Sequence, residues 1–349
     1  MAVTAQVPVL RPDEIADGAA RLEVRPDGSV LTPMAFVDLA AASEKEMSAA
    51  AAALADTRSK ILVGVAGTAS AELTAHLSIT LASGEQAAGS RSWVVVPDVD
   101  AVAARIASTV EANPCAALAL RDLLRLTSSL DAVGDGLVAE SFAYSMLLAG
   151  AEFARWRNSR PRHALPVFQA DPVLVERLDG VLDVRLNRPE RRNSFSREVR
   201  DALLEALLLP ELDPTIEQIR ITGRGPTFCS GGDLDEFGST ADVVTAHQVR
   251  TTQAVGLAIH RLRDRTVVEL HGACIGAGIE VPAFAGRVLA RPDVSIRLPE
   301  LSMGLVPGAG GTVSLPRRIG RWRTEYLALS GQPIDFETAL TWGLVDGPG

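Results

Sequence analysis

Short apolar runs and longer helical patterns alternate along the first half of the chain. Residues 60–66 (KILVGVA) and 92–97 (SWVVVP) predict buried strands, and the stretch between them, 71–81, has the spacing of a helix. Three further helical stretches are expected, and Gly134 and Gly136 predict a break before the last of them. These stretches are 99–112, 115–127 and 136–157.

Two local signals near the N-terminus add detail to this half. Ser43 and Glu46 form the Ser-x-x-Glu pattern of a capping box, which predicts a helix from there to about Asp56. Earlier in the chain, two short alternating segments flank the Pro-Asp-Gly sequence at 26–28. This arrangement predicts a hairpin turn.

The second half of the chain alternates strands with helices. Residues 173–178 and 181–186 predict a β-hairpin around Asp179 and Gly180. The elements expected after this hairpin are helices over 197–209 and 243–262 and strands over 216–222 and 266–270. The alternation indicates an α/β fold in which helices cover a sheet.

The change of pattern divides the chain into three parts. Residues 158–172 contain three prolines and predict a linker. We therefore expect a mixed α/β extension over 1–90, a helical segment over 91–165 and the main α/β core over 166–349. A chain of 349 residues with 47% hydrophobic content can bury a sizeable core.

Composition excludes several classes of function. The net charge of −9 and the absence of a long basic run argue against a nucleic-acid partner. No apolar run reaches about 18 residues, and the N-terminus lacks a basic-plus-apolar leader, so we expect no membrane association. The three cysteines are far apart and lack metal-ligand spacing, which predicts a cytoplasmic protein without a metal site.

The candidate chemistry is concentrated in residues 271–312. Glu280 and Glu300 each lie beside a glycine-rich turn, GAG before the first and GAGG after the second. The first turn is expected to open a helix over 279–286, whose free N–H groups can hold a developing negative charge. The alternative is that the glycines serve packing and the glutamates are solvated.

A second glycine turn follows the strand expected at 216–222. Ser230, Gly231, Gly232 and Asp233 would expose backbone N–H groups at this point. Two such turns can direct one N–H each at a single carbonyl oxygen, which makes a two-donor oxyanion hole for an enolate. The sequence has no phosphate-loop or dinucleotide fingerprint and no compelling Ser-His-Asp arrangement, so no nucleotide cofactor is predicted.

With these motifs, the segment from about Leu174 to Asp346 resembles the crotonase (enoyl-CoA hydratase/isomerase) family. The matching segments are, in order, LNRPERRNSFS, FCSGGDL, HGACIGAGIE, LPELSMGLVPGAGGT and ALTWGLVD. The resemblance implies a spiral of ββα turns, an acyl-CoA thioester substrate, no further cofactor, and a homotrimer or a hexamer built from two trimers. It also implies that Gly232 and Ala277 donate the two oxyanion-hole N–H groups.

The resemblance gives both glutamates a role. In the family's hydratases two glutamates hold one water, and Glu280 and Glu300 fall on both positions. Having both favours an enoyl-CoA hydratase, a lyase that adds water across the 2,3 double bond of a 2-enoyl-CoA. The alternatives are the family's isomerase, hydrolase, decarboxylase and oxygenase reactions, or a non-catalytic subunit that only binds acyl-CoA.

The resemblance also implies a binding surface for CoA. Arg188, Arg191 and Arg192 are natural partners for its 3′-phosphate and diphosphate, although each could instead belong to a solvated basic turn. Arg250 and Gln253 are expected on a solvated helix face, with the lining of the pocket as the alternative. The other residues assigned to substrate or CoA binding are Asn193, Ser194, Phe195, Ser230, Gly231, Asp233 and Gly308.

The family normally continues past the GLVD segment with helices that cover the acyl pocket, and these helices are not found after GLVD in this chain. Residues 93–163 resemble that tail, from VVPDVDAVAARIA to GLVAESFAYSMLLAGAEFARWRNSRP. We expect a circular permutation, in which this segment packs near Glu280 and Glu300 and Phe153 or Trp156 lines the cleft. The alternative is an unrelated helical domain with its own core, as in the superfamily's cofactor-free dihydroxyphenylacetyl-CoA dioxygenases.

Overall fold

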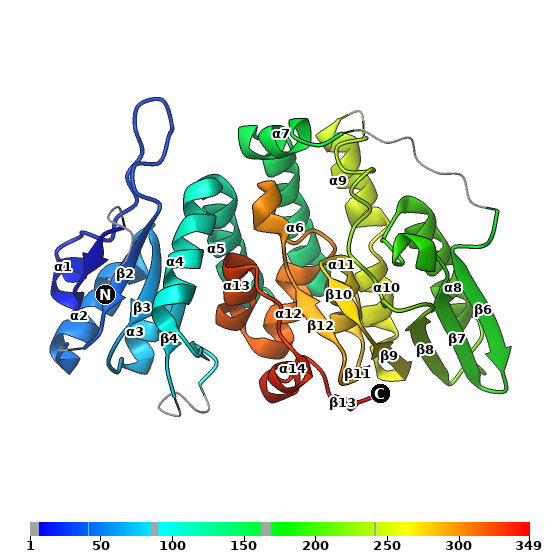
Figure 1. The fold of residues 1–349 in the computed structure, drawn as a ribbon. Helices are drawn as coiled ribbons and strands as arrows, with labels where there is room; N and C mark the ends of the chain where they lie inside the picture. Colours follow the sequence, from blue (N-terminus) through cyan, green and yellow to red (C-terminus); the bar gives the residue numbers. More distant parts are fainter. Residues whose placement is uncertain (1–6, 41, 85–89, 162–168, 241) are drawn as a thin grey trace.

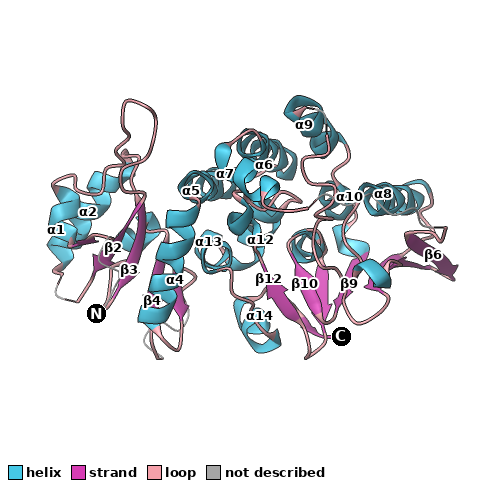
Figure 2. Cartoon of the chain, turned by 45° about the horizontal axis from the view of Figure 1, so that its top comes forward, coloured by secondary structure: helices cyan, strands magenta, loops and turns pink. Residues whose placement is uncertain are grey.

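The computed structural model describes residues 7–40, 42–84, 90–161, 169–240 and 242–349. A β-sheet lies at each end of the molecule, and a layer of helices separates the two sheets (Figure 1). Figure 2 shows the same order from a second direction, with two groups of strands on either side of the helices. The predicted linker falls partly on 162–168, which lies outside the described residues.

The N-terminal sheet contains five parallel strands that follow one another in sequence order. They are β1 (Val9–Leu10), β2 (Met34–Asp38), β3 (Ile61–Val65), β4 (Ile79–Ala82) and β5 (Trp93–Val95). On one face, residues such as Val37 and Leu62 pack with side chains of the short connecting helices. Those helices are α1 (Pro12–Ala16), α2 (Glu44–Ala55) and α3 (Ala71–His76). The other face, with Phe36 and Val63, joins the main core.

Four consecutive helices form most of the middle layer: α4 (Val99–Ala112), α5 (Pro114–Ser129), α6 (Val133–Leu148) and α7 (Ala151–Asn158). α5 packs on α12 (Gly311–Ile319), and both α4 and α5 contact α13 (Arg321–Ser330). α6 packs on α9 (Val243–Thr252). Among the described residues no single helix is long and apolar enough to cross a membrane; α6 and α7 reach that size only together, with a bend of 62° between them.

The C-terminal sheet has six strands, and all of its neighbours are parallel except the hairpin pair β6–β7. Its order is β13 (Gly347–Pro348), β11 (Arg287–Ala290), β9 (Thr266–Leu270), β8 (Gln218–Gly223), β7 (Val181–Leu186) and β6 (Val173–Leu178). A separate parallel pair joins β10 (Ala273–Ile275) to β12 (Ser295–Arg297), and a bridge between Cys229 and Cys274 brings the glycine turn at 230–233 beside the turn at 276–278. The remaining helices are α8 (Arg197–Leu212), α10 (Val255–Arg261), α11 (Ala277–Glu280) and α14 (Phe336–Trp342), with 3-10 turns at Pro189–Arg191, Arg263–Arg265, Pro282–Phe284 and Glu300–Met303.

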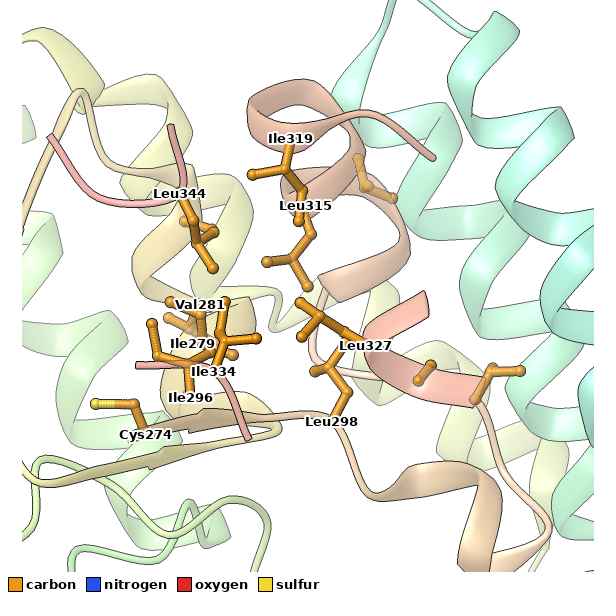
Figure 3. Close-up of a cluster of buried hydrophobic side chains, with 14 of the residues drawn as sticks. Cys274, Ile279, Val281, Ile296, Leu298, Leu315, Ile319, Leu327, Ile334 and Leu344 are labelled. Carbon is orange, nitrogen blue, oxygen red and sulfur yellow. The ribbon is translucent and has the colours of Figure 1, made fainter. Parts of the chain in front are cut away.

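A buried apolar cluster packs β10, β12 and α11 against α12 and α13 (Figure 3). Ile279 and Ile296, from α11 and β12, face Leu315 of α12 and Leu327 of α13 across this cluster, and all four side chains are fully buried. The side chains of α5 and α6 belong to the same continuous core. The helical segment therefore does not form a lobe with a core of its own.

Local signals in the sequence are confirmed by the structure. Ser43 accepts the amide of Glu46, whose carboxylate accepts the amide of Ser43, so the capping box starts α2 as predicted. Val24 and Val30 pair across the predicted Pro-Asp-Gly turn. The hairpin β6–β7 has the predicted bounds, and Asp179 in its turn adopts φ +51°.

One helix prediction is wrong and the start of another helix is displaced, because strand pairing and helix packing override local spacing. The helix expected over 71–81 ends at His76, and Ile79–Ala82 is β4 instead, because it completes the sheet between β3 and β5. The predicted break before the last helix is present at residues 130–132, between α5 and α6, although Gly134 and Gly136 themselves lie inside α6. A Cβ at Gly136 would lie 3.1 Å from the side chain of Val313, so this glycine allows α6 to pack closely on α12. A second break, which the sequence did not predict, divides the stretch 136–157 at Ala149 and Gly150, between α6 and α7.

Two further helices are shorter than predicted. The stretch 243–262 is divided at Gln253 and Ala254 into α9 and α10. The helix expected over 279–286 is a single α-turn, α11, followed by a 3-10 turn that begins at Pro282. Proline lacks the amide that a continuing α-helix requires, which explains this change.

Candidate active site

A cavity of about 200 Å³ lies between the C-terminal core and the middle helices. Glu280, Glu300, Gly232 and Ala277 all line it, so the structure brings together the four residues that the motifs single out. The opposite wall belongs to α6, which contributes residues such as Glu140 and Tyr144. The cavity is therefore built from both halves of the chain.

The two predicted carboxylates are both buried and differ in their hydrogen bonding. Glu280, at the end of α11, accepts the amides of Ala309 and Gly311 at 2.8 and 2.9 Å. Glu300 opens a 3-10 turn, and its Oε2 has no hydrogen-bond partner within the described part of the chain. Gly276 lies beside both carboxylates at φ +51°, and a Cβ there would collide with Glu300 Oε1. A solvated pair, the alternative reading of these glutamates, is excluded by their burial.

Glu140 is a third buried carboxylate in the cavity, and the sequence analysis missed it. Its Oε1 accepts the Gly310 amide at 2.7 Å, and its Oε2 accepts the amide and the hydroxyl of Thr312 at 3.0 and 2.7 Å. A glutamate in the middle of a largely apolar helix is the only sequence signal for it, because its partners are more than a hundred residues away.

Burial in a shared site raises the pKa of all three carboxyl groups. It raises the pKa of Glu300 to about 8 and that of Glu140 to about 7. The pKa of Glu280 is raised well above its ordinary value by burial and by the charges of Glu300 and Glu140, while its two backbone donors oppose this rise. The cavity therefore holds at least one proton near neutral pH, and a carboxyl group beside a carboxylate can act as an acid–base pair.

The two glycine motifs lie side by side at the cavity wall. The amide of Cys229 donates to Ala273, and the amide of Ile275 donates to Cys229, at 3.3 and 3.0 Å. The amides of Gly232 and Ala277 follow directly after these contacts, and neither donates to an acceptor in the residues that the structure describes. Two unpaired amides beside one cavity are the arrangement that an oxyanion hole requires.

The predicted CoA-binding loop is held together by its own polar side chains. Arg191 donates to Asp233 at 2.8 Å and to Asp235 at 2.9 Å, and Ser194 also donates to Asp233. Asn193 is fully buried. It accepts the amide of Arg188 in the same loop and donates to the carbonyls of Arg224 and Thr227 in the segment after β8. These side chains therefore fix the loop, and their contact with a ligand stays a prediction.

The remaining predicted binding residues occupy different positions. Arg188 is buried and lies 3.5 Å from Glu198, whereas Arg192 is exposed. Phe195 and Gly308 line the cavity directly. Ser230 donates its amide to Arg192, and Gly231 follows at φ +95°, close to Ile275.

A larger cleft of about 870 Å³ adjoins the cavity and shares nine of its lining residues, among them Tyr144, Phe195 and Gly308. Four arginines line it: Arg157, Arg197, Arg200 and Arg250. Arg250 and Gln253 thus line the cavity and the cleft, which corrects their placement on a solvated helix face. Phe153 lines the cleft too, and Trp156 stacks on it at 5.6 Å.

The middle helices do pack over the cavity, as the permuted arrangement predicts. β5, however, pairs with β4 in the N-terminal sheet, so the segment that carries these helices also belongs to that sheet. Circular permutation therefore stays a prediction.

The fold and the site define an α/β protein with an acid–base cavity and two unpaired backbone donors. Residues 176–347 match the enoyl-CoA hydratase/isomerase family. The 1,2-epoxyphenylacetyl-CoA isomerase of Escherichia coli (strain K12) is 34% identical over 171 residues, which are 48% of this chain and 65% of that protein. The enoyl-CoA isomerase/hydratase of Mycosarcoma maydis is 30% identical over 185 residues, 50% of this chain and 68% of its own length. The chain belongs to the enoyl-CoA hydratase/isomerase family.

A solved structure that matches part of this chain is the enoyl-CoA hydratase from Thermoplasma volcanium GSS1. It has a TM-score of 0.48 and 31% identity and covers 52% of this chain and 73% of its own. The chain spans slightly less than two thirds of the isomerase from Escherichia coli. Because the names of the relatives include isomerases and hydratases, family membership alone leaves the reaction open.

Proposed function

We propose that this protein acts on acyl-CoA thioesters and that it hydrates the 2,3 double bond of a 2-enoyl-CoA. The observation that carries the proposal is the pair of buried carboxyl groups, Glu280 and Glu300, in one cavity with the free amides of Gly232 and Ala277. An isomerase or a hydrolase needs one acid–base group at this point. Two carboxyl groups on one cavity can hold and activate a water molecule from both sides.

The geometry supports a definite order of proton transfers. The thioester oxygen accepts the two free amides, which stabilise negative charge on it. Water forms a bond to Cβ and gives its proton to one carboxylate, and the electron pair of the double bond moves toward the thioester as an enolate. The other carboxyl group gives its proton to Cα, and the carbonyl forms again. The product is the 3-hydroxyacyl-CoA.

Hydrogen bonding favours a different role for each glutamate. The Ala309 and Gly311 amides oppose the rise that burial and the neighbouring charges cause in the pKa of Glu280, and no such donors reach Glu300 Oε2 among the described residues, so we assign Glu280 to activate the water. Glu300 has an oxygen without a partner among the described residues and a pKa raised to about 8 by burial, so we assign it to protonate Cα. The four arginines of the outer cleft supply the charge that the CoA phosphates need, and no other cofactor takes part.

The ultraviolet absorbance of the conjugated thioester tests the proposal. We expect wild type to remove this band from crotonyl-CoA or from a longer 2-enoyl-CoA, with a product heavier by one water, and Glu300→Gln to leave the band in place. If wild type leaves the band of every 2-enoyl-CoA unchanged, the hydratase proposal fails. A band that appears with a 3-enoyl-CoA would then indicate an isomerase, and oxygen uptake with an arylacetyl-CoA would indicate an oxygenase.

A further inference from the structure

Four successive backbone amides at the start of α12 bind two carboxylates in alternation. Ala309 and Gly311 donate to Glu280, whereas Gly310 and Thr312 donate to Glu140. The first amides of a helix lack partners inside the helix, and when buried they need acceptors from elsewhere. Here one acceptor is a predicted catalytic group, and the other comes from α6, 170 residues earlier in the chain.

The turn is packed closely against both carboxylates at once. Gly310 adopts φ +103°, and a Cβ on Gly311 would lie 2.6 Å from Glu280 Cγ, so the backbone lies directly against that side chain. On the other side, the Thr312 hydroxyl donates to Glu140, and the Thr312 carbonyl accepts the hydroxyl of Thr127 at 2.6 Å. A shift of the turn toward or away from Glu140 therefore changes the position of Glu280.

We infer that Glu140 is a positioning residue of the active site, which holds the 309–312 turn and thereby fixes the Glu280 carboxylate and the charge balance of the Glu280–Glu300 pair. The inference deepens the proposed hydration and rests on it for its kinetic part. Glu140 needs no contact with the substrate for this role. Through Glu140, α6 from the first half of the chain contributes directly to the arrangement of the active site.

The charged and titratable groups around Glu140 come from four elements. Tyr144 lies on α6, the helix that also carries Glu140. Arg250 lies on α9, Glu280 on α11, and Glu300 at the start of a 3-10 turn. Arg250 favours the charged form of Glu140, and the charge of Glu140 in turn raises the pKa of both other glutamates. Removing this charge should therefore lower the pKa of Glu300.

The test compares Glu140→Gln with a matched control, Glu152→Gln. Glu152, on α7, also accepts two amides at a helix start, those of Cys115 and Ala116, but it does not line the cavity. Rates with a 2-enoyl-CoA are measured across pH, with circular dichroism melting as a check on folding. A glutamine has the shape of Glu140 but only one acceptor oxygen, whereas the turn needs two. The variant therefore cannot accept all of the hydrogen bonds that the turn donates to Glu140.

The expected result for Glu140→Gln is a fall in kcat of about tenfold or more, with KM changed by less than about threefold. The rate of this variant should also begin to fall at a lower pH on the alkaline side of its pH–rate profile, by roughly half a unit or more, because Glu300 loses its proton more readily. Glu152→Gln should keep both the kcat and the limb of wild type. An unchanged kcat, or a lower kcat with an unmoved alkaline limb, would overturn the inference, since the second pattern is that of a merely structural residue.

Two additions keep the test decisive. If Glu140→Gln does not fold, Thr312→Val removes one donor to Glu140 while keeping the backbone amide, and a smaller shift of the limb in the same direction is required. The titration of the Glu300 carboxyl is also followed by ¹³C NMR in wild type and Glu140→Gln, with assignment through Glu300→Gln. If wild type hydrates nothing, the proposed function fails, but a lower Glu300 pKa in Glu140→Gln still supports the positioning role and an unchanged one rejects it.

Discussion

Glu300 occupies space that Gly276 leaves open. Gly276 precedes α11 at φ +51°, and the carboxylate of Glu300 lies where a side chain at 276 would begin. The same glycine also lies near Glu280, since a Cβ there would be 3.5 Å from Glu280 Oε1. One backbone position thus separates the two carboxyl groups of the site.

Gly276→Ala should therefore remove activity while leaving most of the fold intact. The new methyl group displaces Glu300, and a misplaced catalytic group costs on the order of a hundredfold in rate. The backbone at Gly276, φ +51° and ψ −119°, is one that side chains rarely adopt, which adds roughly 1–3 kcal/mol of destabilisation. Gly18→Ala is the matched control, because Gly18 has φ +95° and open space around its Cβ position. We expect similar losses of stability in urea unfolding and a loss of hydration only in Gly276→Ala; equal activities would refute the steric argument.

Exchange of the Cα proton should separate the roles of the two glutamates. Both Glu280→Gln and Glu300→Gln should lower kcat for hydration by about 10²- to 10⁴-fold, because each removes one proton-transfer group. A saturated acyl-CoA in D₂O requires only the group that faces Cα. We expect Glu280→Gln to retain exchange at Cα, measured by ¹H NMR, and Glu300→Gln to lose it. The reverse pattern would exchange the two assignments.

Glu280 and Glu300 could be singled out from the sequence because each carboxylate lies within a short glycine motif that is recognised within a few residues, although in space each contacts the other's motif. The same holds for the α2 capping box and for the β6–β7 hairpin, which depend on contacts within a few residues. Glu140 could not be found in this way, because the groups that donate to it come into place only when α6 packs on α12.

Long-range packing also explains the errors in the fold. Gly136 resembles a helix breaker in isolation, but in the structure it allows close contact with Val313. Residues 79–82 fit a helical pattern until two neighbouring strands are available for pairing. In both cases the deciding partner is far away in the sequence, so local spacing contains no information about it.

Glu300→Gln should change the pH dependence of stability. Below about pH 4.5, the ordinary value, the Glu300 carboxyl is protonated in the folded and the unfolded chain and contributes nothing. Between about 4.5 and about 8 the unfolded chain releases this proton while the folded chain retains it, so the free energy of unfolding falls by about 1.4 kcal/mol per pH unit. Above about 8 the penalty is constant.

Glutamine removes this penalty, and the variant should therefore gain stability relative to wild type as the pH rises from 5 to 8. Urea unfolding of both proteins at several pH values measures this difference. A difference between variant and wild type that is the same at every pH would contradict a buried, protonated Glu300.

Arg200→Gln should weaken the binding of CoA substrates without slowing the chemistry. Arg200 lines both the cavity and the outer cleft, where phosphates would meet several guanidinium groups. We expect KM to rise about fivefold, with kcat within about twofold of wild type, and the effect to shrink at high salt because such contacts are screened. The matched control here is a truncated substrate. An enoyl-pantetheine lacks the nucleotide phosphates, so wild type and Arg200→Gln should have the same KM for it. An equal effect on both substrates would place Arg200 elsewhere.

The second half of the chain should depend on the first half for its site. Without residues 7–161, the amides of Gly310 and Thr312 lose Glu140, and the face of α12 around Val313 loses its contact with α6. Unpaired buried amides and exposed apolar surface are both costly, so we expect 169–349 alone to be poorly soluble and inactive. Coexpression of 1–161 and 169–349 as two chains should give a complex that copurifies and hydrates 2-enoyl-CoA, because the contacts across the cavity do not require a continuous chain. Hydration by 169–349 alone, at a rate near that of the intact chain, would show instead that the middle helices cover the site without taking part in it.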